Sequence, residues 1–118
     1  MVRFVPERGR AAETWQLQAD PDVLATGADG SVWVLNLGGG AVTSLGPSGS
    51  VGAPIRVGSH SSDIAVGPDA VWVSDIDSGV VRRIDPELGR EVDQLPVRGR
   101  PAAVAVDPVT GDLWVYLA

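Results

Sequence analysis

The side chains that could do chemistry are few in this sequence, and they lie in short polar segments. His60 is the only histidine, in the segment Gly58-Ser-His-Ser-Ser-Asp63, and there is no cysteine. Without cysteine there is neither a disulfide framework nor a thiolate metal site. A single histidine with no neighbouring nucleophile or second ligand does not make a catalytic triad or a zinc site. We therefore expect no catalytic residue, no metal site and no cofactor, and we interpret His60 as a loop residue that can hydrogen-bond.

A second polar segment, Asp75-Ile-Asp77-Ser-Gly79, has the oxygen-rich character of a calcium-binding loop. It lacks the third acidic residue and the distal glutamate that such loops use. The corresponding segment from Asn36 to Gly40 contains no acid at all. The pattern is therefore more typical of a turn in which an aspartate accepts backbone hydrogen bonds.

Basic residues are densest in the second half of the chain, at Arg82, Arg83, Arg98 and Arg100. Successive side chains of a strand point to opposite faces, so we expect Arg82 or Arg83 to pair with an acid on a neighbouring strand. The formal net charge is −6, which argues against a nucleic-acid-binding surface because such a surface needs a basic stripe. No apolar stretch of this sequence approaches the length that a membrane span needs, so we expect no membrane insertion.

The elements that must position these residues are clearest between Asp63 and Gly99. Four short apolar runs are separated there by Gly-Pro-Asp, Asp-Ile-Asp-Ser-Gly and Asp-Pro-Glu-Leu-Gly. The runs are Ile64–Val66, Val71–Ser74, Val80–Ile84 and Glu91–Val97. Runs of this length between turn sequences predict a four-stranded antiparallel sheet. Such a sheet is apolar on both faces and must stack on copies of itself.

Copies of this unit recur along the chain at a constant interval. Glycines at positions 9, 49 and 89 and alanines at positions 25, 65 and 105 keep the same spacing, and the motif from Arg3 to Glu7 lies two such spacings before the motif from Arg83 to Glu87. Four strands in a period of about 40 residues are the signature of a β-propeller blade. We expect the repeated tryptophans, Trp33, Trp72 and Trp114, to pack between blades, and Trp15 to lie on the outer rim. Gly49 and Gly89 should have positive φ in the turn between the third and fourth strands.

The sequence thus predicts an all-β fold of about three blade equivalents, a partial β-propeller over residues 1–118. Residues 1–18 supply the third and fourth strands of one blade, residues 19–58 and 59–98 each form a full blade, and residues 99–118 supply a first and a second strand. Leu113–Tyr116 could pair with Val2–Val5 within one molecule, or between two molecules to form a six-bladed ring with two-fold symmetry. The third alternative is an open arc with exposed strand edges. We favour the absence of closure within one chain, and a homodimer that completes the ring.

The repeats resemble those of a known family. Ile64-Ala-Val-Gly-Pro-Asp-Ala-Val-Trp-Val, Gly79-Val-Val-Arg-Arg-Ile-Asp-Pro and Leu95-Pro-Val-Arg-Gly are similar to YVTN/NHL-type β-propeller repeats, which are common in actinobacterial sensor and exported proteins. The resemblance covers nearly the whole chain. It implies a non-catalytic module that binds a ligand or a protein, as the sensing part of a larger exported protein. An extracytoplasmic location follows from the resemblance alone, since residues 1–9 have no apolar core for a signal peptide.

A more distant similarity leads to the alternative function, a lyase-like or hydrolytic enzyme. The virginiamycin B lyase family is a related propeller family that uses a histidine and a metal-binding glutamate. Its repeats carry Leu-Trp-Phe-Thr-Glu where this chain has Val32-Trp-Val-Leu-Asn36 and Val71-Trp-Val-Ser-Asp75. The glutamate is unmatched, so this resemblance favours the enzyme less than the binding module.

A ligand site, if the module has one, should lie where the fourth-to-first strand connections and the second-to-third strand turns meet. The polar residues that vary between repeats are at that end, and the opposite end carries repeat-like turns. The candidate ligand-binding residues are Asp20, His60, Asp75, Asp77 and Arg100. The expected partner is a small molecule, a glycan or a protein.

Overall fold

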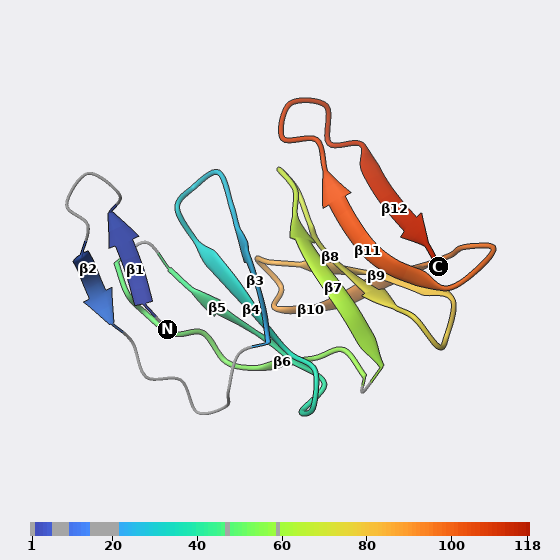
Figure 1. Cartoon of the computed structure of the whole chain (residues 1–118), viewed down its shortest axis with the longest axis horizontal. Helices are drawn as coiled ribbons and strands as arrows, with labels where there is room; N and C mark the ends of the chain where they lie inside the picture. Colours follow the sequence, from blue (N-terminus) through green and yellow to red (C-terminus); the bar gives the residue numbers. More distant parts are fainter. Residues whose placement is uncertain (1, 6–9, 15–21, 47, 59) are drawn as a thin grey trace.

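The structure of the 118-residue chain is a computed structural model. It describes residues 2–5, 10–14, 22–46, 48–58 and 60–118 (Figure 1). Every regular element among these residues is a β-strand, and none of them belongs to a helix that could cross a membrane. The prediction of an all-β fold is therefore confirmed.

Twelve strands form two complete sheets and two hairpins. The strands are β1 (Val2–Val5), β2 (Arg10–Thr14), β3 (Val23–Thr26), β4 (Val32–Asn36), β5 (Ala41–Leu45), β6 (Ile55–Arg56), β7 (Ser61–Val66), β8 (Val71–Asp75), β9 (Val80–Asp85), β10 (Arg90–Pro96), β11 (Pro101–Val106) and β12 (Leu113–Leu117). Their order in space is β1-β2, β3-β4-β5-β6, β7-β8-β9-β10 and β11-β12, antiparallel throughout. Each complete sheet is an up-and-down blade, as the turn spacing predicts.

Boundaries differ from the predicted ones mainly at the outer strands. β6 contains only Ile55 and Arg56, whereas the sequence predicts a strand over 53–57. Pro54 precedes it and has no backbone N–H to give to β5, which accounts for the late start. β2 runs from Arg10 to Thr14, whereas the sequence predicts this strand over 12–18. Two inner strands also begin earlier than predicted. β7 starts at Ser61 and not at Ile64, and β11 starts at Pro101 and not at Ala103, because pairing with β8 and β12 continues beyond the apolar run.

The turns that join the third and fourth strands contain the expected glycines. Gly49 has a φ of +89° and Gly89 a φ of +67°, a region in which residues with a side chain are strained. The Gly89 N–H donates to the Asp85 carbonyl oxygen, closing the β9–β10 turn at 2.9 Å. The prediction of positive φ at both glycines is confirmed.

The sheets stack through their first strands. β3 contacts β7, and β7 contacts β11, so the innermost strands of three successive units lie side by side. Figure 1 shows the resulting arc, with β1 and β2 at one end and β12 at the other. β1 pairs with β2, β12 pairs with β11, and no pairing among the described strands joins β1 to β12. The composite blade is therefore not formed within one chain, and the arc is open.

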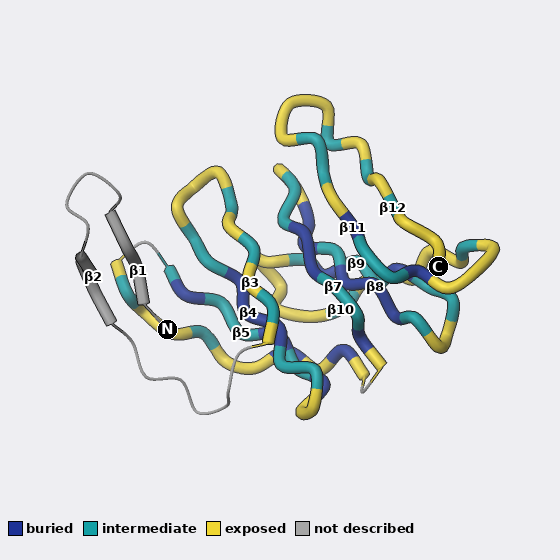
Figure 2. The backbone as a smooth tube through the Cα atoms, viewed as in Figure 1, coloured by how far each residue is buried: buried dark blue, intermediate teal, exposed yellow. Residues whose placement is uncertain are grey.

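Buried residues lie between the sheets, as Figure 2 shows for β4, β7 and β8. The larger cluster joins the two complete blades, and its members are Trp33, Leu35, Val42, Ile55, Val57, Ile64, Val71, Val73 and Ile84. A smaller cluster lies between the second blade and the β11–β12 hairpin, around Ala65, Val81 and Val104. Apolar residues on both faces of β8 are thereby covered, which explains its continuous apolar run.

The three repeated tryptophans have very different surroundings. Trp33 is 6% exposed in the larger cluster, and Trp72 is half-buried beside the smaller one. Trp114 is 70% exposed, which corrects the prediction that all three pack between blades. The reason is that no further sheet lies over its face among the described residues. Trp15 lies outside the described residues.

Candidate functional site

The turn between β8 and β9 is built by the side chain of Asp75. Its Oδ1 accepts a hydrogen bond from the Ser78 N–H at 3.0 Å, and its carbonyl oxygen accepts one from the Gly79 N–H at 3.1 Å. Gly79 has a φ of +66°, which lets the chain reverse into β9. The expected aspartate-stabilised turn is thus confirmed, and it presents Asp77 at its tip.

Two connections between blades bring a histidine and an arginine to this tip. His60 precedes β7, and its carbonyl oxygen accepts the Ile76 N–H at 3.1 Å, which ties the connection to the turn. His60 Nε2 lies 3.7 Å from Asp77 Oδ2, and Arg100 Nη2 lies 3.3 Å from Asp77 Oδ1. All three side chains are about half exposed or more. We call His60, Asp77 and Arg100 the loop cluster, and the end of the blades that carries it the loop end.

A buried ion pair supports the turn from below. Arg82 of β9 donates from Nη2 to Asp75 Oδ2 at 2.8 Å and from Nη1 to Glu91 Oε1 at 2.9 Å. The Asp75 side chain is 2% exposed. Burial alone would raise the pKa of Asp75, but the hydrogen bonds from Arg82 and Ser78 outweigh burial and lower it. Arg82 therefore pairs with acids on both neighbouring strands, which confirms the prediction that one of the two adjacent arginines would do so.

Three of the five candidate residues meet in the loop cluster. Asp75 does not join them, because its carboxylate points into the interface and is occupied by Arg82 and Ser78. Asp20 lies outside the described residues. Positions 20, 60 and 100 are one repeat apart, so the same repeat position supplies a polar side chain three times. Glu91 was not among the candidates, since a single acid on an outer strand gives no signal in the sequence.

The loop cluster has the chemistry of a polar contact surface. Exposed ion pairs contribute little to stability and exchange readily with solvent or other polar groups. No group of three His, Asp or Glu side chains in the described part of the chain is arranged to hold a metal ion. The side chains of His60 and Arg100 are about 60% exposed, so their N–H groups that do not face Asp77 lie at the surface.

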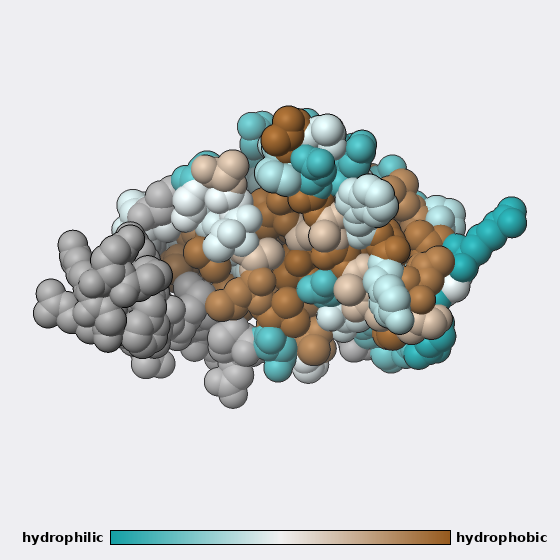
Figure 3. Space-filling view, turned by 45° about the horizontal axis from the view of Figure 1, so that its top comes forward, coloured by the Kyte–Doolittle hydropathy of each residue, from teal (hydrophilic) through white to brown (hydrophobic). Residues whose placement is uncertain are grey.

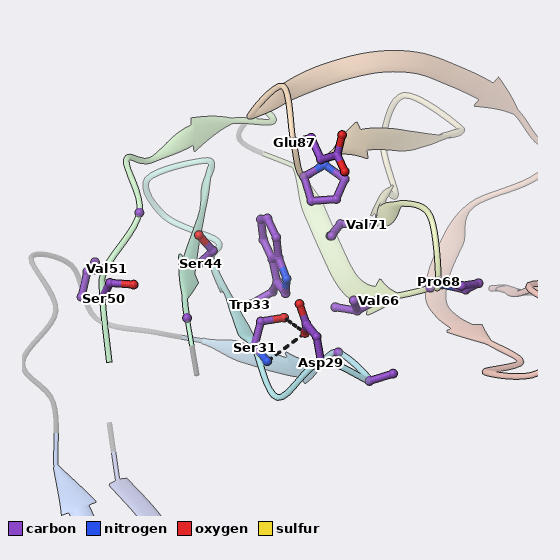
Figure 4. Close-up of a pocket in the computed structure, with 16 residues that line it drawn as sticks. Asp29, Ser31, Trp33, Ser44, Ser50, Val51, Val66, Pro68, Val71 and Glu87 are labelled. Carbon is purple, nitrogen blue, oxygen red and sulfur yellow. Dashed lines mark hydrogen bonds between the residues drawn. The ribbon is translucent and has the colours of Figure 1, made fainter. Parts of the chain in front are cut away.

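A groove lies at the opposite end of the blades, which we call the turn end. It has a volume of about 670 Å³, and it lies between the two complete blades. Figure 4 shows Trp33 as one wall, with Val66 and Val71 from the second blade facing it. Figure 3 shows apolar side chains across the centre of this end, between hydrophilic turns.

The two acids of the groove are hydrogen-bonded or solvated. Asp29 accepts hydrogen bonds from Ser31 Oγ at 2.6 Å and from the Ser31 N–H at 3.0 Å, which lower its pKa. Glu87 is exposed at the rim. None of the candidate residues from the sequence lines this groove. Most of its lining residues belong to the turns of the two complete blades.

Comparison with known proteins gives matches in structure only. The sequence matches no protein-family model and no curated protein. Among solved structures, the chain is similar to hydrazine synthase of Kuenenia stuttgartiensis, with a TM-score of 0.75 and 19% identity over 91% of this chain and 32% of that one. It is also similar to virginiamycin B lyase of Staphylococcus aureus (TM-score 0.66, 22% identity, 90% of this chain and 37% of that one). A gluconolactonase of Xanthomonas campestris gives a TM-score of 0.64 and 20% identity over 93% of this chain and 46% of that one.

These similarities bear on the fold. The chain spans less than half the length of each of these three proteins. Their chemistry differs, which agrees with the general rule that a fold hosts many functions. Together with the stacked four-stranded antiparallel sheets, the similarities show that this chain is a partial β-propeller.

Proposed function

We propose that this chain is a non-catalytic propeller module of the YVTN/NHL type, which binds a polar ligand at its loop end. The convergence of His60 and Arg100 on Asp77 carries the proposal. These residues come from two separate blade connections and one turn, so only the folded arc brings them together. Binding residues are commonly found on loops that a rigid scaffold positions, and the sheets below provide that scaffold.

The electrostatics of the loop cluster favour a ligand that carries both donors and acceptors. Asp77 offers carboxylate lone pairs, and Arg100 and His60 offer N–H groups around it. A glycan or a small polar molecule with adjacent hydroxyl or carboxylate groups can bind both this acceptor and the donors beside it. Since the existing ion pairs are exposed, replacing them with ligand contacts costs little.

Two observations support binding over catalysis. Asn36 and Asp75 occupy the positions of the glutamate in the lyase-type repeat, and the Asp75 carboxylate is engaged by Arg82. His60 has Asp77 as its charged neighbour, and a lone imidazole beside a solvated acid lacks the nucleophile or second acid of a hydrolytic site. The proposed membership in an exported sensor protein rests on the repeat resemblance.

Chemical-shift mapping of backbone amides with defined probes tests the site. We would titrate the labelled protein with acetate, glucose and N-acetylglucosamine, and expect shifts at 60–63, 75–79 and 98–101. Arg100→Ala should abolish them. Arg98→Ala is the matched control because it removes the same charge from the same connection, and it should leave them in place. Shifts confined to residues 28–30, 68–70 and 107–112 would place binding at the turn end and overturn the proposal.

A further inference from the structure

The outer edge of β12 presents main-chain groups that its counterparts use for strand pairing. At one end of the β11–β12 ladder the Asp107 N–H donates to the Asp112 carbonyl, and at the other the Ala118 N–H donates to the Arg100 carbonyl. Because the groups of an antiparallel strand alternate in direction, those of Trp114 and Tyr116 face β11. The N–H and C=O groups of Leu113 and Val115 therefore point to the outer edge, where no described strand pairs with them.

The equivalent strands of the two complete blades are paired on this edge. β4 pairs with β5, and β8 pairs with β9. In the second blade the partners are Val71 with Ile84, Trp72 with Arg83 and Val73 with Arg82. A second strand of a blade in this fold thus takes a third strand, and β12 is a second strand without one among the described residues.

The chain contains a hairpin of the complementary kind. β1 and β2 pair with each other, and among described strands β1 has no other partner. The sequence around β1, Arg3-Phe4-Val5-Pro6-Glu7, corresponds to Arg83-Ile84-Asp85-Pro86-Glu87 of β9 and its turn. β1 is therefore a third strand and β2 a fourth strand of a blade whose first two strands are supplied from elsewhere.

The exposed apolar surface of β12 adds a second, independent observation. Trp114 is 70% exposed and Tyr116 67% exposed, on a strand whose equivalents are largely buried. In the second blade the Arg83 guanidinium lies 5.9 Å from the centre of the Trp72 ring, directly across the strand pair. The repeat places Arg3 at the position of Arg83 and Trp114 at the position of Trp72. The same cation–π pair would form if β1 were paired with β12.

We propose that the open edge of β12 binds β1 of a second copy of this chain. The pairs are Leu113 with Phe4, Trp114 with Arg3 and Val115 with Val2, in the register of β8 with β9. The strands β1 and β12 lie at opposite ends of the arc (Figure 1), so each copy offers one edge of each kind. A two-fold axis then joins two arcs at two identical junctions, and the three blade equivalents of each copy give a ring within the four to eight blades of known propellers.

The molecular mass in solution is the first test. Sedimentation equilibrium of the 118-residue chain over a dilution series should give a species of twice the 12.2 kDa chain mass. Trp114→Arg should raise the dimer Kd by about tenfold or more, because it removes a central aromatic contact and faces Arg3 with a like charge. Val109→Arg is the matched control: Val109 is 89% exposed in the β11–β12 turn, away from the edge, and its replacement should leave the Kd unchanged.

Disulfide trapping tests the partner strand and the register. In a non-hydrogen-bonded antiparallel pair the Cα atoms lie about 4.5 Å apart, within the range a disulfide spans. The double variant Arg3→Cys/Trp114→Cys, oxidised with oxidised glutathione, should give a covalent dimer on a non-reducing gel. Arg3→Cys/Val109→Cys should give no covalent dimer, because position 109 lies in the β11–β12 turn, away from the paired edge. The chain has no other cysteine that could react. A monomer at all concentrations, a dimer that Trp114→Arg does not weaken, or a disulfide within one chain would each overturn the proposal.

Discussion

Two surfaces of this arc begin from the same sequence pattern and have opposite surroundings. In the first blade, Trp33 of β4 pairs with Ala25 of β3. The second blade packs against the Trp33 side chain, which is only 6% exposed. In the β11–β12 hairpin, Trp114 pairs with Ala105 in the same way, and it is 70% exposed. Pairing with the first strand is thus the same at the two sites. The differences are that β4 also pairs with β5, which β12 has no counterpart for among the described strands, and that a neighbouring sheet covers Trp33. The repeat sequence specifies the strands of one blade. Whether the tryptophan of that blade is buried depends on whether another blade packs against it.

The largest expected effect comes from removing the covered tryptophan. Trp33→Ala should lower the free energy of unfolding by about 3–5 kcal/mol, since it leaves a cavity in the larger cluster. Trp114→Ala should change it by less than about 0.5 kcal/mol in dilute solution, since its side chain is already solvated. Urea unfolding of both variants at several protein concentrations measures this. If both variants lost the same free energy of unfolding in dilute solution, packing by a neighbouring blade would not distinguish the two tryptophans.

The blades could be predicted from sequence because their signals are local. Turn sequences mark both ends of each apolar run, and the positive φ of Gly49 and Gly89 follows from a glycine that recurs while its neighbours vary. The burial of Trp114 could not be predicted by the same reasoning. Periodicity reports which face of a strand is apolar, but the partner that covers the face lies outside the repeat unit. The position of Trp114 in the repeat therefore predicts that it is buried like Trp33, although it is exposed.

The buried acid of the β8–β9 turn should give the next largest effect. Asp75→Asn should destabilise the protein by roughly 2–4 kcal/mol at neutral pH, because it leaves Arg82 facing an uncharged group at the interface. The pKa of Asp75 is lowered in the folded state, so its contribution is complete above its ordinary value of 3.8 and is lost as the pH falls through the folded value. The difference between wild type and Asp75→Asn should accordingly shrink in acid. Unfolding curves at pH 7 and pH 3 provide the test, and a difference that grows in acid would contradict the lowered pKa.

The exposed Gly89 contributes to stability through its backbone conformation and not through packing. A Cβ at Gly89 would meet nothing within 4 Å, so packing predicts no cost for a larger side chain there. Its φ of +67° nevertheless makes Gly89→Val unfavourable by about 1–2 kcal/mol. Leu88→Val, at an exposed neighbour, should stay within about 0.5 kcal/mol. Thermal unfolding of the pair measures the difference, and equal effects would show that coverage alone governs this turn.

The candidate site shows the same limit of sequence reasoning. The polar residues at the loop end could be identified because they interrupt the repeat, and His60 and Arg100 share one position in it. Their convergence on Asp77 depends on the stacking of β7 against β11, which no local pattern specifies. Asp75 and Asp77 look alike in the sequence, but the strand direction turns one carboxylate into the interface and leaves the other in solvent. The groove at the turn end was missed because it is formed between blades by residues with ordinary turn roles.

The smallest expected effect on stability belongs to Asp77, two residues beyond the buried acid. Asp77→Asn removes a carboxylate whose side chain is 49% exposed and whose neighbours, His60 and Arg100, are themselves largely in solvent. Ion pairs of this kind contribute about 0.2–1 kcal/mol and are screened by salt, so we expect a loss below about 0.5 kcal/mol that vanishes at high ionic strength. The same substitution should nonetheless weaken the sugar shifts at the loop end, because it takes away the charged acceptor for hydroxyl donors, whereas the acetate shifts should persist, because acetate no longer competes with Asp77 for Arg100. Urea unfolding at low and high salt, run beside the shift mapping, separates the two roles. A loss as large as that of Asp75→Asn would mean that Asp77 is part of the structural support of the turn and would remove the distinction between a buried scaffold and an exposed binding surface.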